Sequence, residues 1–309
     1  MHPIQHITSV SQFDLARIKQ LFLRVQEMRG IEKRGACSIL DNKIMASLFY
    51  EPSTRTRLSF EASMLRLGGE VMGTESAGHF SSATKGETLE DTIKIIAGYA
   101  DVIVLRHPEK GAADRAAAVS PVPIVNAGDG DGEHPTQALL DLFTIMEAHP
   151  DPRTCQVVFV GDLLKGRTVH SLARLLTLFH TPMSFVAPTP LQLPPEFAHG
   201  LIENGCEVTQ HETLREVIER ADVLYMTRVQ KERLTGIEGI ALDGSDYALT
   251  PELVSLMPTS CIIMHPLPRN SEIPTWFDED PRAAYFRQAK NGLYVRMALL
   301  EELLNPFPE

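Results

Sequence analysis

The stretch IMASLFYEPSTRTRLSFEASMLRL, residues 44–67, decides the fold, because it carries a strand, a polar turn and a helix in immediate succession. Residues 44–50 form a mostly apolar run that is typical of a buried strand. Residues 56–67 have helical spacing, and Gly68-Gly69 ends the helix. Such β-α units build parallel sheets that are covered by helices.

The turn Ser53-Thr54-Arg55-Thr56-Arg57 lies where this strand gives way to the helix. The unpaired N–H groups and the positive dipole end of a helix face outward at such a turn, and the hydroxyls and guanidiniums add further donors. We therefore predict a phosphate site built on Ser53, Thr54, Arg55 and Thr56. The alternative is an ordinary helix cap with exposed arginines, but so many donors at one turn favour a phosphate site.

The same alternation of strands and helices fills the rest of the chain. Further strands are expected at 102–105, 122–125, 156–160, 183–186, 223–226 and 261–264. Helices are expected at 87–99, from Pro135 onward, at 167–179, 213–220, 251–257 and 291–304, with an opening helix that a capping box of Ser11 and Asp14 starts and Gly30 ends. The breaker cluster at 149–152 marks a domain boundary. We predict an α/β protein with two doubly wound domains, each with a mainly parallel sheet covered by helices on both faces.

Composition restricts the class of ligand. The chain of 309 residues has a formal net charge of −11 and a pI near 5.5, so neither nucleic acid nor a membrane is an expected partner. No apolar run reaches the about 18 residues that span a bilayer, and residues 1–10 lack the features of a signal peptide. The four cysteines match no disulfide framework or zinc site. We expect a cytoplasmic protein, without a metal, that binds a small anion.

Further polar residues follow the expected strands of the first half. Arg106 comes directly after the expected strand at 102–105, so its side chain could reach the same site. The alternative is an ordinary surface arginine. His134 follows a glycine-rich segment and Gln137 lies one helical turn on, so that an imidazole and an amide could polarise one carbonyl group. A structural histidine that caps a helix is the alternative for His134. Ser81 and Lys85 lie in a polar loop, where a lysine is usually only solvated.

In the second half, Arg167, Arg228 and Gln230 again lie at strand ends or helix starts. Arginines at such positions can bind carboxylates with two parallel hydrogen bonds. Each arginine could instead be a salt-bridge partner of an acidic residue. Only the shared placement of these residues favours a binding role.

Together these motifs resemble the catalytic chain of the aspartate carbamoyltransferases, in order and over nearly the whole sequence. The strings that carry the resemblance are FYEPSTRTR (49–57), KGET (85–88), VLRHP (104–108), the segment 126–137 that ends in HPTQ, VGD (160–162), GRTVHS (166–171), the segment 225–233 and HPLPR (265–269). A series of this length is far more specific than any single motif.

The resemblance implies a carbamoyl-phosphate domain over 1–149, an aspartate domain over 150–287, and a C-terminal helix at 288–309 that crosses back to the first domain. It implies a homotrimer with active sites at the subunit boundaries, and it leaves open a regulatory chain. The phosphate would be held by Ser53, Thr54, Arg55, Thr56 and Arg106, with Ser81 and Lys85 from the adjacent subunit. Thr56, Arg106 and His134 would polarise the carbonyl group, and Gln137 with the backbone carbonyls of Pro266 and Leu267 would hold the amide. Aspartate would be bound by Lys85, Arg167, Arg228 and Gln230, and Glu51 would close the domains by pairing with Arg167 and Arg233.

The implied reaction is transfer of the carbamoyl group from carbamoyl phosphate to aspartate in pyrimidine biosynthesis. It requires alignment of the amine with the carbonyl carbon and stabilisation of an oxyanion, but no covalent intermediate, metal or cofactor. By resemblance, the departing phosphate takes the amine proton.

Three alternatives concern the substrate and the class of protein. Ornithine carbamoyltransferases are similar in the phosphate half, but they carry a cysteine in the motif that reads HPLP at 265–268 here. Arg228 and Gln230 would also repel a cationic side chain, so aspartate is preferred. A non-catalytic assembly subunit is less consistent with the retained arginines and histidine, and a nicotinamide-binding dehydrogenase lacks the G-x-G-x-x-G spacing after residues 157–161.

Overall fold

The computed structural model describes residues 6–34, 37–75, 86–228 and 247–305. The chain forms two compact units, which we call unit 1 (Met1–Leu140 with Lys290–Glu309) and unit 2 (Asp141–Ala289). Each unit contains its own sheet and its own core. The α/β class and the two helix-covered parallel sheets are thereby confirmed.

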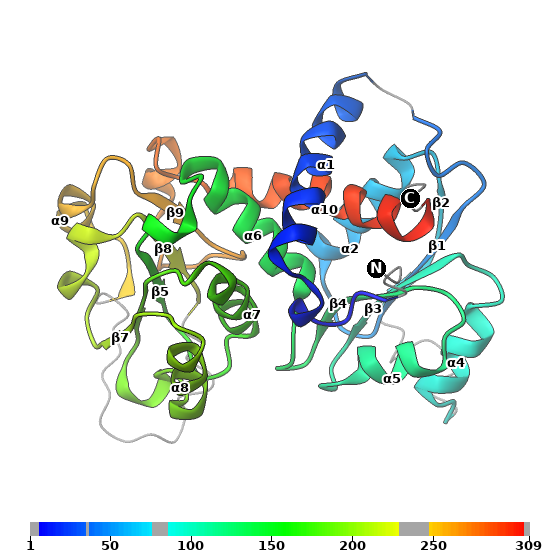
Figure 1. Ribbon diagram of the computed structural model, residues 1–309, viewed down its shortest axis with the longest axis horizontal. Coiled ribbons are helices and arrows are strands. Elements are labelled where there is room, and N and C mark those ends of the chain that lie inside the picture. Colours follow the sequence, from blue (N-terminus) through cyan, green and yellow to red (C-terminus); the bar gives the residue numbers. More distant parts are fainter. Residues whose placement is uncertain (1–5, 35–36, 76–85, 229–246, 306–309) are drawn as a thin grey trace. The chain divides into compact units, whose positions relative to one another are not determined.

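Unit 1 is built on a four-stranded sheet of order β2-β1-β3-β4 (Figure 1). Its strands are β1 (Ile44–Phe49), β2 (Glu70–Glu75), β3 (Val102–His107) and β4 (Ile124–Asp129). All neighbouring strands run parallel, with Met45 beside Val102 and Ile103 beside Ile124. The sequence did not predict β2, because EVMGTE carries no apolar run.

Helices cover both faces of this sheet. Unit 1 contains η1 (Val10–Gln12), α1 (Leu15–Arg34), α2 (Thr54–Arg66), α4 (Leu89–Ile96), α5 (Ala112–Val119), the start of α6 (Pro135–Ala148) and most of α10 (Tyr285–Leu304). Figure 1 shows α4 and α5 on one side of the sheet, and α1, α2 and the end of α10 on the other. Ile93 of α4 and Ala116 of α5 pack against Ala46, Leu48 and Ile103 of the strands.

Unit 2 contains a five-stranded parallel sheet of order β7-β6-β5-β8-β9. Its strands are β5 (Val157–Val160), β6 (Met183–Val186), β7 (Val208–His211), β8 (Val223–Met226) and β9 (Ile262–Met264). Its helices are α7 (Arg167–Leu176), α8 (Pro195–Glu203) and α9 (Pro251–Leu256), with η3 (Pro152–Thr154), η4 (Thr177–Phe179), η5 (Thr189–Leu191), η6 (Leu214–Glu216), η7 (Ile218–Arg220) and η10 (Thr275–Glu279). The inner strands are buried along their whole length, as expected for a sheet covered on both faces.

Several predicted helices differ from the observed ones. The capping box is made by Ser9 and Gln12 and belongs to η1, whereas Asp14 accepts a hydrogen bond from the Arg17 N–H at 2.8 Å at the start of α1. α1 continues beyond Gly30, because a glycine costs only about 1 kcal/mol in a helix and Ile31 beyond it is buried. The helix expected at 213–220 is two short 3₁₀ helices, η6 and η7.

The division into units falls inside helices α6 and α10. Asp141 of α6 bonds to Tyr225 and Gln288, which all belong to unit 2. The end of α10 packs in unit 1, where the Ser63 hydroxyl donates to the Leu293 carbonyl at 3.0 Å and Arg296 donates to Ser59 at 2.8 Å. The functional domain limits at 149 and 288 remain predictions.

Candidate functional site

Strand order locates a candidate binding edge in each unit. In unit 1 the chain proceeds outward from β1 in both directions, so the order switches between β1 and β3. In unit 2 the switch lies between β5 and β8. Doubly wound sheets bind ligands beyond the carboxyl ends of their strands at such a switch. The predicted site residues Ser53 and Arg106 lie at the first switch, and Arg167 and Arg228 lie at the second.

In unit 1, α2 begins directly after β1 and carries the predicted phosphate donors. Ser53 is the N-cap residue, but its side chain makes no capping hydrogen bond. Thr56 is buried and Arg55 is exposed. The alternative of an ordinary capped helix therefore loses its main support, because the hydroxyl that would cap the helix is not used for capping.

Arg106 lies at the end of β3, beside Phe49 of β1 in the sheet. Its side chain is 13% exposed, and it donates to the Ala127 carbonyl at 3.1 Å. It also forms an ion pair with Glu51 at 3.4 Å. Bonds from neighbouring segments therefore orient this guanidinium at the carboxyl edge of the sheet, and it is not a mobile surface group.

His134 and Gln137 lie at the start of α6, with Pro135 as the first helical residue as predicted. His134 is 4% exposed, and its carbonyl accepts the Gln137 N–H at 3.0 Å. The preceding loop is held by Asp129, whose carboxylate accepts hydrogen bonds from the Glu133 N–H at 2.8 Å and the Gly111 N–H at 2.7 Å. The sequence analysis assigned Asp129 no role. Its position between two glycines in GDGDG could have indicated a loop that its carboxylate stabilises by hydrogen bonds.

In unit 2, Arg167 is the first residue of α7 and Arg228 follows β8. Gly161, with a φ of 122°, allows close approach of the backbone to Thr227, since a Cβ there would lie 2.4 Å from the Thr227 carbonyl oxygen. Pro266 and Leu267 follow β9, and both are partly exposed. Because β5, β8 and β9 are parallel neighbours, these residues share the carboxyl edge of one sheet.

Four predicted site residues, Ser81, Lys85, Gln230 and Arg233, lie outside the described residues. Glu51 has a partner within unit 1, namely Arg106. Its predicted role in domain closure with Arg167 and Arg233 remains a prediction.

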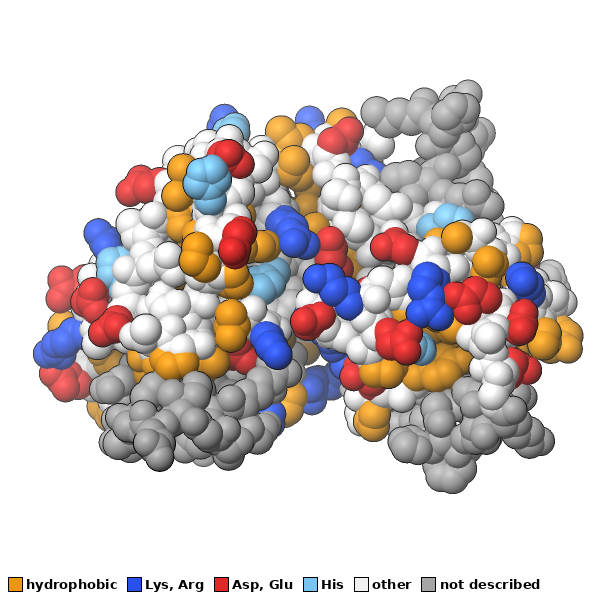
Figure 2. Space-filling view, turned by 90° about the horizontal axis from the view of Figure 1, so that it is seen from below, with side chains coloured by type: hydrophobic (Ala, Val, Ile, Leu, Met, Phe, Trp, Pro, Cys, Tyr) orange, Lys and Arg blue, Asp and Glu red, His pale blue; other side chains and the backbone are white. Residues whose placement is uncertain are grey.

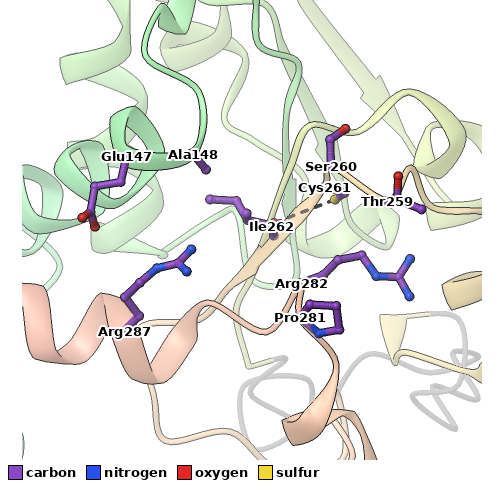
Figure 3. Close-up of a pocket in the computed structure, with 9 residues that line it drawn as sticks. All are labelled: Glu147, Ala148, Thr259, Ser260, Cys261, Ile262, Pro281, Arg282 and Arg287. Carbon is purple, nitrogen blue, oxygen red and sulfur yellow. Dashed lines mark hydrogen bonds between the residues drawn. The ribbon is translucent and has the colours of Figure 1, made fainter.

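A pocket of about 370 Å³ in unit 2 lies at the opposite end of β9 (Figure 3). It contains none of the predicted site residues, and its lining includes Cys261, Ile262, Arg282 and Arg287. Arg282 is already bonded to Asp280 at 2.8 Å and to the Val254 carbonyl at 3.0 Å. Burial raises the pKa of Cys261 to about 12, so this thiol is not a reactive nucleophile. We therefore place no function there.

On the face drawn in Figure 2, acidic and basic side chains are interspersed among the described residues. Within the described ranges, no group of three or more His, Cys, Asp or Glu residues could hold a metal ion. None of the helices there is long and apolar enough to cross a membrane.

Comparisons with known families and structures agree with the two-sheet α/β fold. Residues 5–147 match the carbamoyl-phosphate-binding domain of aspartate/ornithine carbamoyltransferase, and residues 153–303 match the Asp/Orn-binding domain. The chloroplastic aspartate carbamoyltransferase of Arabidopsis thaliana is 51% identical over 300 residues, which cover 95% of this chain and 76% of that protein.

Two solved structures superpose on almost the whole chain. The catalytic subunit of M. jannaschii aspartate transcarbamoylase has a TM-score of 0.90 at 44% identity, covering 97% of this chain and 98% of that one. The Trypanosoma cruzi aspartate transcarbamoylase in complex with N-(phosphonacetyl)-L-aspartic acid also has a TM-score of 0.90, at 42% identity, covering 97% of this chain and 96% of that one.

Proposed function

The chain belongs to the aspartate/ornithine carbamoyltransferase family, and from this membership we propose how it works and which residues do the work. It is a transferase that moves the carbamoyl group of carbamoyl phosphate to the amino group of L-aspartate. The products are N-carbamoyl-L-aspartate and phosphate. The observation that carries this function is the 51% identity to an aspartate carbamoyltransferase across 95% of the chain.

In unit 1, the proposed ligand is carbamoyl phosphate. The backbone N–H groups at the start of α2 and the hydroxyls of Ser53, Thr54 and Thr56 would surround the phosphate, with Arg55 and Arg106 supplying positive charge. Thr56, Arg106 and His134 would polarise the carbonyl oxygen, and Gln137 would hold the amide. The support is the placement of these residues at one edge of the sheet.

In unit 2, the proposed ligand is aspartate, the second anionic substrate. Arg167 and Arg228, joined by Gln230, would bind the two carboxylates of aspartate, and the carbonyls of Pro266 and Leu267 would accept from the carbamoyl amide. The cationic side chain of an acceptor such as ornithine would be repelled at Arg228 and Gln230. The cysteine expected in the HPLP motif of an ornithine enzyme is absent from residues 265–268.

The proposed mechanism is direct attack of the neutral amine on the carbonyl carbon. The new C–N bond forms, negative charge develops on the carbonyl oxygen, and the bond from carbon to the phosphate oxygen then breaks. Prealigned cationic and neutral donors stabilise the oxyanion without reorganisation. The departing phosphate takes the proton that the amine releases, so no protein side chain has to act as a strong base.

Assembly and compartment are proposed from family membership. We propose a homotrimer in which Ser81 and Lys85 complete the site of the adjacent subunit, with the carbamoyl-phosphate domain over 1–149 and 288–309 and the aspartate domain over 150–287. A regulatory chain remains an open expectation. The predicted cytoplasmic compartment is one of two candidates, because the Arabidopsis relative is a chloroplastic enzyme.

The decisive test is an acceptor comparison with the purified chain. Carbamoyl phosphate is supplied with either aspartate or ornithine, and the carbamoylated product is measured colorimetrically. We expect product with aspartate and at most background with ornithine. Product only with ornithine would contradict the assigned acceptor, and no product with either would support the assembly-subunit alternative.

A further inference from the structure

A buried hydrogen-bond chain in unit 2 ends at the loop that carries Pro266 and Leu267. The Tyr225 hydroxyl donates to one carboxylate oxygen of Asp141 at 2.7 Å, and the Gln288 amide donates to the other at 2.6 Å. The side-chain amide oxygen of Gln288, Oε1, in turn accepts a hydrogen bond from the backbone N–H of His265 at 2.8 Å. None of these four side chains is more than 2% exposed.

The side chain of His265 continues this chain into the loop itself. Its Nδ1 accepts the backbone N–H of Leu267 at 2.7 Å, and its Nε2 lies 2.9 Å from Oε1 of Glu272. Because Nδ1 is an acceptor, the ring proton must be on Nε2, which donates to the carboxylate. A single neutral tautomer satisfies both bonds.

Glu272 is itself held in the ionised form. Burial raises the pKa of Glu272, but the hydrogen bonds from His265 and from the Asn270 N–H outweigh burial and lower it overall. Its carbonyl also accepts the Leu249 N–H at 2.9 Å. The acceptor that orients the imidazole is therefore anchored on two sides.

We propose that His265 is a positioning residue for carbamoyl transfer, which sets the conformation of Pro266 and Leu267 so that their carbonyls face the carbamoyl amide. This inference rests on the proposed function. The physical reason is that Leu267 adopts a φ of 56°, a rarely populated conformation that must be maintained by its surroundings. The bond from its N–H to His265 Nδ1 supplies that constraint from inside the unit.

Two variants separate the two ring bonds. In His265→Asn, the side-chain oxygen takes the place of Nδ1 and can still accept the Leu267 N–H, whereas the contact with Glu272 is lost. In His265→Gln, the amide takes the place of Nε2 and can still reach Glu272, whereas the bond to Leu267 is lost. We expect His265→Gln to raise KM for carbamoyl phosphate about tenfold and to lower kcat about 10²-fold. For His265→Asn we expect both constants to stay within about threefold of wild type.

Product inhibition by inorganic phosphate gives a readout that loss of stability would not move. The proposed phosphate donors in this chain lie in unit 1, so the inhibition constant for phosphate should stay within about twofold in His265→Gln. Ser184→Ala is the control, because Ser184 is also buried in unit 2, bonded to Thr209 at 2.8 Å, and distant in sequence from the loop. It should lower the melting temperature without changing KM.

The inference is overturned if His265→Gln keeps wild-type kinetics, if both His265 variants lose activity equally, or if phosphate inhibition weakens in parallel with KM. Should His265→Gln not fold, His265→Ala, which likewise offers no acceptor to the Leu267 N–H, is measured instead, and a KM for carbamoyl phosphate equal to that of wild type contradicts the role. Failure of the wild-type chain to form carbamoyl aspartate would overturn the proposed function and this inference together. An active wild type with unaffected variants would overturn only the inference.

Discussion

Ser53 allows a contribution to helix stability to be distinguished from a contribution to ligand binding. It occupies the N-cap position of α2, and yet its side chain does not cap the helix. Replacing a capping serine by alanine usually costs about 1 kcal/mol of stability. Because the Ser53 side chain makes no capping hydrogen bond, its removal should cost little.

We expect Ser53→Ala to change the free energy of unfolding by less than about 0.5 kcal/mol while it raises KM for carbamoyl phosphate. Asp14→Ala is the matched control, since Asp14 does cap a helix of the same unit through the Arg17 N–H at 2.8 Å. The control should lose about 1 kcal/mol and keep its KM. Urea unfolding and steady-state kinetics of both variants decide the point, and a large stability loss in Ser53→Ala would contradict it.

Arg106 carries a second prediction at this scale. We expect Arg106→Ala to lower kcat by at least about 10²-fold, because it removes a donor to the developing oxyanion, with the fold retained. Arg115→Ala is the control, because Arg115 is an exposed arginine of unit 1 that is paired with Glu90 and Glu109, each at 2.7 Å. Rates of carbamoyl aspartate formation and circular dichroism are compared. Near-normal turnover in Arg106→Ala would refute the assigned role.

Sequence reasoning at this scale found residues that follow strands, but not the residues that hold them. Arg106 and His134 could be selected because their neighbours in the chain are apolar strands and glycines. Asp129, His265 and Glu272 received no role, because the partners that define them are set by the folded loop rather than by a local pattern. The pairing of Glu51 with Arg106 was missed for the same reason.

At the scale of elements, the boundary region between η10 and α10 is held by one acidic side chain. Asp278 of η10 bonds to Arg269 and to the Tyr285 hydroxyl, with one Arg269 contact at 2.7 Å. The hydrogen bond from Arg269 lowers the pKa of Asp278 to about 2. The sequence predicted α10 only from 291, because these contacts at its first turn have no helical periodicity.

This pair predicts a specific dependence of stability on pH. A carboxyl group whose pKa is lowered by folding stabilises the native state above its unfolded value near 4, and the contribution disappears as the pH falls toward 2. We therefore expect Asp278→Asn to be less stable than wild type by about 1 kcal/mol at pH 6, since the pair is largely solvent-screened. The difference should shrink as the pH is lowered to 3, as measured by urea unfolding. A difference that does not depend on pH would show that the charge of Asp278 is not responsible.

The whole chain was predictable to the level of two parallel sheets, because buried strands of parallel sheets are short apolar runs that stand out in sequence. The edge strands β2 and β7 were not, because neither is wholly buried: three residues of β7 are partly buried and Gln210 is exposed. The edge strands β4 and β9 are buried, and both were predicted. The exact division into units could not be read either, since α6 and α10 are continuous helices that belong to both. The hydrophobic periodicity of the sequence indicates that a helix continues, but it does not indicate which core each turn of the helix packs against.

Assembly provides the last prediction, because the proposed trimer divides one active site between two subunits. Arg55→Ala and Lys85→Ala should each be inactive alone, and Lys85 itself lies outside the described residues. In randomly mixed trimers, three quarters of the assemblies contain both variants, and each of these has one boundary at which an intact Arg55 meets an intact Lys85. About a quarter of wild-type activity per chain should therefore return on mixing equal amounts. Mixing Arg55→Ala with Arg106→Ala is the control, because both residues belong to the same subunit's share of the site and no intact site can form. Subunit exchange is verified by native mass spectrometry, and full exchange without recovered activity would show that Lys85 acts within its own subunit or not at all.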